Sequence, residues 1–197
     1  MKCDIILAGV GGQGVLSISS LIATAALQQG LHVKQSEVHG MAQRGGAVQA
    51  HLRLADHTIH SDLIPKGSAD LILSMEPIEG LRYLDYLSTA GALITSKAAV
   101  ENIPDYPPQD EVLRAIVKLP RARVIDAAGL ARKAGSARAT NVVMVGAAAG
   151  LLPVGEELIR RTIRAVFARK GERTVETNLA AFNAGREAAA PARPTTA

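Results

Sequence analysis

Residues 4–27, Asp-Ile-Ile-Leu-Ala-Gly-Val-Gly-Gly-Gln-Gly-Val-Leu-Ser-Ile-Ser-Ser-Leu-Ile-Ala-Thr-Ala-Ala-Leu, decide the fold. The apolar run at 4–8 predicts a buried strand, and the apolar spacing of 15–27 predicts a helix. The glycines between them resemble a dinucleotide fingerprint, in which backbone N–H groups at a helix N-terminus approach a phosphate. The candidate cofactor-binding residues of this turn are Gly9, Gly11, Gly12, Gln13 and Gly14.

An acidic residue at the expected distance extends this pattern. Glu37 follows Gly14 by 23 residues, near the end of the next expected strand. Taken literally, the pattern predicts NAD or FAD binding by an independent oxidoreductase. The alternative is a tight packing turn between strand and helix that binds no ligand.

A second polar stretch lies at residues 36–46, Ser-Glu-Val-His-Gly-Met-Ala-Gln-Arg-Gly-Gly. It is flanked by expected strands at 32–35 and 47–54, and it predicts a loop, where function concentrates. Its candidate catalytic residues are His39 and Glu37, and its candidate binding or subunit-interface residues are Gln43, Arg44, Gly45 and Gly46. The alternatives are a solvated turn, or an internal pair between Glu37 and Arg44 with His39 held at a subunit contact.

The chemistry of these side chains is distinct. Arg44 can hold a carboxylate or phosphate through two N–H groups, and His39 has an ordinary pKa near neutrality, suited to proton transfer. If the first two strands are parallel neighbours, both polar segments leave the same edge of the sheet. We therefore expect the glycine turn and the 36–46 stretch to face one cleft.

Composition narrows the class of protein. The chain has 197 residues, 48% of them hydrophobic and 3% aromatic. Its net charge is +4, and its lysine and arginine residues do not cluster in one block of the sequence. An aliphatic core and few rings for base stacking do not favour nucleic-acid binding. The single cysteine, Cys3, excludes internal disulfides and cysteine-based metal clusters, and we expect it in the core, with no metal site. Without a signal peptide or an apolar run long enough to cross a bilayer, we expect a cytoplasmic protein that does not bind membranes.

The pattern along the chain predicts an α/β fold, a three-layer Rossmann-like sandwich with a mostly parallel sheet, one edge hairpin and a helical C-terminal segment. Further strands are expected at 58–63 as the hairpin partner, and at 70–75, 92–95 and 123–126; helices are expected from Glu76-Pro77 through Leu87 and at 141–151, 155–170 and 175–188, with an irregular excursion at 102–110. Asn141 is interpreted as a helix N-cap and Glu76 as a first-turn acid. We expect a single domain at 1–187 and a disordered tail at 188–197.

These motifs together resemble the gamma-type domain of the 2-oxoacid:ferredoxin oxidoreductase family. The resemblance rests on the glycine turn at 9–14, the 36–46 stretch, the 70–82 unit, Asn141 with Gly146, and Asn178-x-x-Ala181-Phe182-x-x-Gly185. It covers about residues 3–187. The Glu-Val-His-Gly-Met-Ala-Gln-Arg-Gly-Gly string is similar, more narrowly, to the small (beta) subunits of indolepyruvate ferredoxin oxidoreductases.

The resemblance implies a division of labour between subunits. A large alpha subunit carries thiamine diphosphate and iron–sulfur clusters, oxidatively decarboxylates an aryl 2-oxoacid to an acyl-CoA, and passes electrons to ferredoxin. The small subunit, inactive alone, binds no cofactor of its own, although its glycine turn, with Asn141, could meet a phosphate of the co-substrate CoA or the partner chain. A purely structural scaffold subunit is the alternative.

Overall fold

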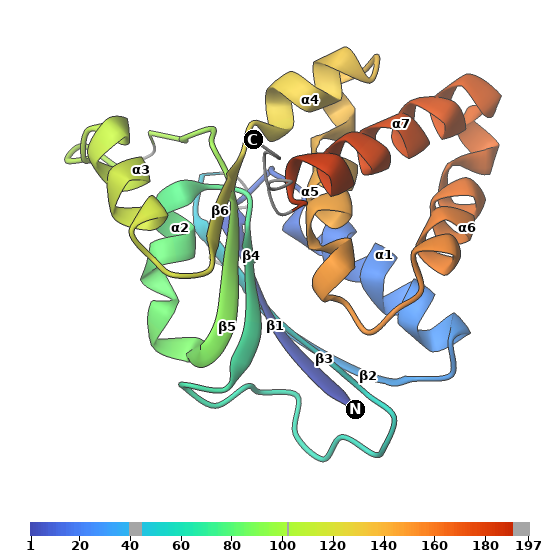
Figure 1. Ribbon diagram of the computed structural model, residues 1–197, viewed down its shortest axis with the longest axis horizontal. Coiled ribbons are helices and arrows are strands. Elements are labelled where there is room, and N and C mark those ends of the chain that lie inside the picture. Colours follow the sequence, from blue (N-terminus) through green and yellow to red (C-terminus); the bar gives the residue numbers. More distant parts are fainter. Residues whose placement is uncertain (40–44, 102, 191–197) are drawn as a thin grey trace, which may run out of the picture.

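The computed structural model describes residues 1–39, 45–101 and 103–190. It is a three-layer α/β sandwich around a six-stranded sheet with the strand order β2-β3-β1-β4-β5-β6 (Figure 1). The strands are β1 Lys2–Val10, β2 His32–His39, β3 Ala47–Ala55, β4 Ala69–Ser74, β5 Leu87–Ser96 and β6 Ala122–Ile125. The helices are α1 Val15–Gln28, α2 Pro77–Arg82, α3 Gln109–Val117, α4 Ala127–Lys133, α5 Thr140–Ala148, α6 Glu156–Phe167 and α7 Glu172–Ala188. The fold class predicted from the sequence is confirmed.

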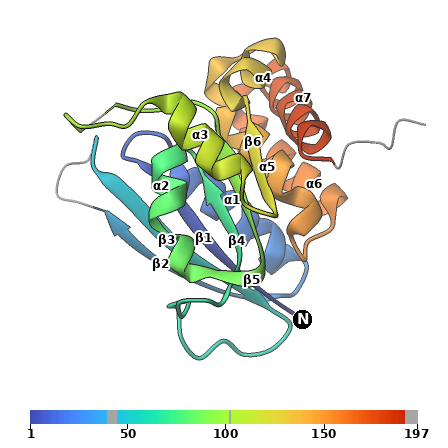
Figure 2. The same ribbon diagram turned by 60° about the vertical axis from the view of Figure 1, so that its left-hand side comes forward.

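The centre of the sheet is buried on both faces, because its central strands are apolar on both sides. Ile5 and Leu7 point into the larger core with α1 and the C-terminal helices, whereas Ile6 points into the smaller core with α2 and α3. Figure 2 shows α2 and α3 together on the face opposite α1. Each side chain of this size stabilises the fold by about 2 kcal/mol when fully buried. Among the described residues, no helix has the length and hydrophobicity needed to cross a membrane.

One strand is inserted where a dinucleotide-binding fold would have parallel neighbours. β1, β4, β5 and β6 are parallel, but β3 lies antiparallel between β1 and β2. β2 therefore runs in the direction of β1, two places away from it. The expectation that the first two strands are neighbours is wrong, and the edge hairpin consists of β2 and β3 rather than of β3 and residues 58–63.

Several element boundaries also differ from the expectations. β2 continues to His39, which pairs with Val48, so that residues 36–39 belong to a strand rather than a loop. The helix after Glu76 ends at Arg82, and Leu87 begins β5. The short helices α3 and α4 were not anticipated, because proline and glycine residues near them favour turns in the sequence.

Residues 58–63 form no strand in the described chain and are held instead by one arginine. The Arg53 guanidinium bonds the fully buried Asp4 carboxylate through Nε (2.8 Å to Oδ1) and Nη2 (3.1 Å to Oδ2). Its Nη1 donates to the carbonyls of Ser61 and Leu63, each at 3.0 Å. These bonds satisfy carbonyls that a strand partner would otherwise have taken.

The C-terminal helices α5 and α7 pack closely against each other. A Cβ on Gly185 of α7 would lie 1.9 Å from the Val143 carbonyl oxygen of α5, and one on Gly146 would lie 2.0 Å from the Phe182 carbonyl oxygen. The two helix backbones are therefore in direct contact. In α6 the buried residues are Ile159, Thr162 and Ile163, which lie on one face of the helix. Of the disordered tail expected at 188–197, Ala188 is the last residue of α7, and residues 191–197 lie outside the described residues.

Candidate functional site

The glycine turn joins the end of β1 to the start of α1, and two of its glycines, Gly9 and Gly14, have no room for a side chain. A Cβ on Gly9 would lie 2.8 Å from Val15 Cγ2 and 3.1 Å from Met75 Cβ. Gly14 has φ of 76°, in the left-handed region that favours glycine. The sequence thus places glycine where strand β1, helix α1 and the residue after β4 meet.

Gln13 fixes the shape of this turn. Its Oε1 accepts a hydrogen bond from the Val10 N–H at 2.8 Å, and its Nε2 donates to the Met75 carbonyl at 3.2 Å. A single amide thereby ties the end of β1 to the end of β4. We assign Gln13 a positioning role in the turn, since both ends of its amide are already engaged within the chain.

Asn141 reaches the turn from the opposite side. It is the second residue of α5 and not its N-cap, so that interpretation was wrong: its Nδ2 donates to the Gly14 carbonyl at 3.2 Å. The same nitrogen would be 2.2 Å from a Cβ at position 14. Asn141 therefore links the C-terminal helices to the glycine turn, although 127 positions separate the two residues in the chain.

A crevice of about 370 Å³ opens beside the turn, at the carboxyl ends of β1, β4 and β5. Its lining includes Gly12, Gln13, Gly14, Met75, Ser96, Arg138 and Asn141. Within the described residues, the N–H groups of Val15 and Leu16 have no acceptor. Unpaired N–H groups at a helix N-terminus and a guanidinium form a surrounding that favours an anion. Arg138 was missed in the sequence, where no motif distinguishes it from other arginines.

The 36–46 stretch meets the glycine turn where its end is described. The Gly11 N–H donates to the Gly46 carbonyl at 2.7 Å, and the Gly45 N–H donates to the Gly11 carbonyl at 3.2 Å. These contacts bring the two predicted segments together. They also occupy the Gly11 amide, which is therefore not available to a ligand.

The remaining candidates of this stretch are placed differently. His39 and Gly9 pair with the same β3 residue, Val48, so both strands end at one margin of the sheet, with the side chain of His39 not described. Gln43 and Arg44 lie outside the described residues. Glu37 is exposed on β2, where the Gln35 amide donates to it at 3.4 Å.

The literal NAD interpretation conflicts with this placement. A ribose-binding acid belongs at the end of the parallel strand next to the glycine turn. Here the neighbouring strand is the antiparallel β3, and Glu37 is one strand further away, about 9.6 Å across the sheet from β1. Glu37 therefore does not complete a dinucleotide site in the way that the spacing suggested.

Two buried acidic residues, Glu76 and Glu79, lie at the start of α2, which follows β4. Glu76 is the N-cap of α2 rather than a first-turn acid, because its carboxylate accepts the Glu79 N–H at 2.8 Å. Tyr106 donates to the same carboxylate, and burial, together with this bond, raises the pKa of the Tyr106 hydroxyl. Burial likewise raises the pKa of Glu79, whose Oε2 has no hydrogen-bond partner among the described residues.

Comparison with known proteins defines the class of this chain. Residues 4–188 match the Pyruvate ferredoxin/flavodoxin oxidoreductase family, and the chain belongs to this family. It is 40% identical to the indolepyruvate oxidoreductase subunit IorB of Archaeoglobus fulgidus, over 98% of both chains. The resemblance inferred from the motifs is thereby confirmed.

Solved structures share the fold. The gamma subunit of a keto/oxoacid ferredoxin oxidoreductase from Geobacter sulfurreducens is 26% identical, with a TM-score of 0.69 over 95% of this chain and 98% of that chain. A 2-oxoglutarate:ferredoxin oxidoreductase from Magnetococcus marinus, solved with 2-oxoglutarate, coenzyme A and succinyl-CoA bound, is 23% identical. Its TM-score is 0.75 over 95% of this chain and 31% of that chain, which is a likeness of fold alone.

Proposed function

We propose that this chain is the small subunit of an indolepyruvate-type 2-oxoacid:ferredoxin oxidoreductase. The observation that carries the proposal is the 40% identity to subunit IorB over 98% of both chains. The complex oxidatively decarboxylates an aryl 2-oxoacid to an acyl-CoA and transfers two electrons to ferredoxin. Residues 1–187 act in it as one domain.

In this proposal a large subunit carries thiamine diphosphate and the iron–sulfur clusters. The composition of this chain supports that assignment, because a four-iron cluster needs several thiolates and the chain has one cysteine. Burial raises the pKa of the Cys3 thiol to about 12, which keeps it protonated and a poor ligand. The redox centres therefore belong to the partner.

The crevice beside the glycine turn is the proposed contribution of this chain. CoA, the acyl acceptor of the reaction, carries phosphates that suit the Arg138 guanidinium in the wall of the crevice and the open N–H groups of Val15 and Leu16 in the adjacent first turn of α1. Gln13 and Asn141 hold the glycine turn in its shape through hydrogen bonds to Val10, Met75 and Gly14. The geometry thus favours a role in binding and orientation, with bond cleavage at the partner's cofactor.

The 36–46 stretch completes the proposal as the segment that meets the partner or its substrate. The contacts of Gly45 and Gly46 with Gly11 place the end of this stretch beside the turn. Arg44 and Gln43 are proposed to hold an anionic group, and His39 and Glu37 to move or hold a proton near the oxo group. This assignment rests on residue chemistry and on the shared margin of the sheet.

Reconstitution tests the function directly. The full chain, co-expressed with its large subunit, should co-purify with it and support ferredoxin reduction that requires both indolepyruvate and CoA. Asn141→Ala should raise the KM for CoA with little effect on assembly, and Arg44→Ala should lower turnover. Failure to form a complex, or turnover independent of CoA, would refute the proposal.

Two further outcomes separate the alternatives. Normal assembly and unchanged kinetics in both variants would leave a scaffold role and remove the crevice from the mechanism. A rise in melting temperature of the isolated chain with millimolar NAD(H) would revive the independent oxidoreductase. We expect no such rise, because Glu37 does not lie on the strand next to the glycine turn.

A further inference from the structure

Two further cavities lie among the helices and share Arg138 with the crevice. One, the cationic chamber, has a volume of about 390 Å³ and lies between η2 (Ala137–Ala139), η4 (Ala168–Lys170) and α7. The other, the apolar chamber, has a volume of about 490 Å³ and lies between α1, α5 and the end of α6. Both have the size of small-molecule sites. They share Arg138, Phe167 and Lys170 in their walls, so they are adjoining parts of one groove.

Three cations border the cationic chamber: Arg138, Lys170 and Arg173. No carboxylate of the described residues lies within 4.0 Å of them, whereas Arg161 and Arg164 on α6 pair with glutamates at 4.0 and 3.8 Å. The three side chains are exposed and have no acidic partner within the described chain, so their donors are available to a bound anion. The Lys170 ammonium lies 5.4 Å from the centre of the Phe167 ring, a contact that holds it at the junction of the chambers.

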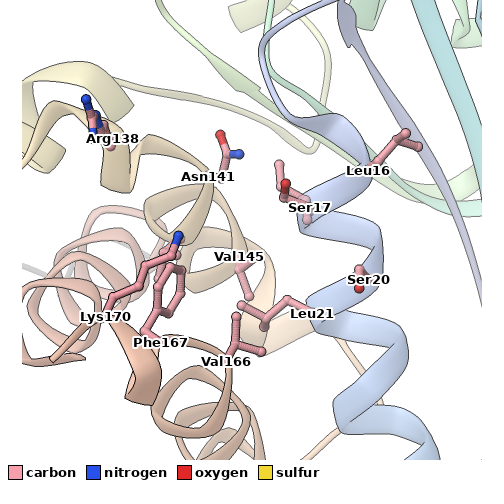
Figure 3. A pocket seen from close by; sticks show the side chains of 12 residues that line it. Leu16, Ser17, Ser20, Leu21, Arg138, Asn141, Val145, Val166, Phe167 and Lys170 are labelled. Carbon is pink, nitrogen blue, oxygen red and sulfur yellow. The ribbon is translucent and has the colours of Figure 1, made fainter. Parts of the chain in front are cut away.

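The apolar chamber has a different character. Figure 3 shows Arg138, Asn141 and Lys170 toward one end of the groove, and Leu21, Val145 and Val166 toward the other. Ser17 and Ser20 of α1 add hydroxyl groups to its wall. A ligand that fits both chambers therefore has a compact polyanionic group at one end and a flat or apolar group with hydrogen-bonding edges at the other.

We propose that the two chambers bind a phosphorylated nucleotide. Its phosphates would lie among Arg138, Lys170 and Arg173, and its sugar and base along the aliphatic floor beside Ser17 and Ser20. A compact phosphate group suits three cations around a single cavity better than an acidic protein segment, whose carboxylates are spread along its length. This site goes beyond the proposed function: it shares Arg138 and Asn141 with the crevice at the glycine turn, but Lys170 and Arg173 do not line that crevice.

Calorimetric titration of the full chain with ADP, pyrophosphate and adenosine tests the proposal. We expect ADP to bind at least about tenfold more tightly than either fragment, because only ADP fills both chambers. Lys170→Gln and Arg173→Gln should each weaken ADP binding about tenfold through loss of a charge-assisted contact. Arg161→Gln is the matched control, because it removes the same charge from an exposed ion pair on α6 and should leave binding unchanged.

Several results would overturn the proposal. Equal affinities for ADP and pyrophosphate would show that the apolar chamber takes no part. ADP binding that is lost in Asn141→Ala but kept in both Gln variants would place the nucleotide in the crevice instead. Absence of ADP binding, with loss of co-purification in the Gln variants, would make the groove a protein interface. The proposed function is judged separately, by CoA-dependent turnover of the wild-type complex.

Discussion

The contact between α5 and α7 makes a sharp prediction for Gly185→Ala. The new methyl group would lie 1.9 Å from the Val143 carbonyl oxygen, a backbone atom that no side-chain rotation can move. Opening this contact to 3 Å requires the two helices to separate by about 1 Å, a form of overpacking that costs about 1–3 kcal/mol. For a domain of this size, we expect the melting temperature to fall by about 2–12 °C.

The same displacement should reach the candidate site, because α5 carries Asn141. Its hydrogen bond to the Gly14 carbonyl is 3.2 Å long, and a shift of about 1 Å would break it. Differential scanning calorimetry of the chain and the KM for CoA of the reconstituted complex measure the two effects. Gly150→Ala is the control, since its nearest non-neighbour atom, in Arg186, lies at 3.6 Å. If Gly185→Ala and Gly150→Ala have the same melting temperature, the two helices are not in the contact described.

Three further predictions concern single side chains. Asn141→Ala should cost about 1 kcal/mol of stability by removing the bond to the Gly14 carbonyl, measured by urea unfolding, and Asn141→Gln should not restore it. Burial raises the pKa of Glu79, so its stabilising contribution is complete below the ordinary pKa of 4.5 and lost as the pH rises through the raised value. The difference between the melting temperatures of Glu79→Gln and wild type should therefore shift in favour of the variant as the pH rises from about 4 to about 7. A difference that does not change with pH would contradict this. Cys3, with its pKa raised to about 12, should react with a thiol reagent at about pH 8 only after unfolding, and rapid labelling of the native chain would show that it is accessible.

Local patterns in the sequence were sufficient for the elements but not for their order in the sheet. The glycines at 9–14 and the apolar run before them predicted α1 to within one residue and β1 to within two residues at each end, because steric demands there are local. The insertion of β3 between β1 and β2 could not be predicted, since antiparallel and parallel neighbours have similar apolar patterns when both faces are buried. The interpretation of Glu37 as a ribose ligand was wrong for this reason.

The candidate site was predicted in part. The glycines of the turn were predicted from their spacing. The structure explains why positions 9 and 14 are glycine: a Cβ at either position would be too close to neighbouring atoms. Asn141 was identified, but with the wrong role, because a residue near a helix start fits an N-cap equally well until its partner in space is known. Arg138 carries no local signal, since its importance comes from a position shared by three cavities.

The bonds of Arg53 have a consequence for the long segment between β3 and β4. Carbonyl groups that are anchored to a strand through a buried ion pair cannot easily adopt the extended conformation that a protease cleaves. This irregular stretch should therefore resist limited digestion as well as the neighbouring strands do, despite its lack of regular secondary structure. A long surface connection of this kind would otherwise be among the first places cut.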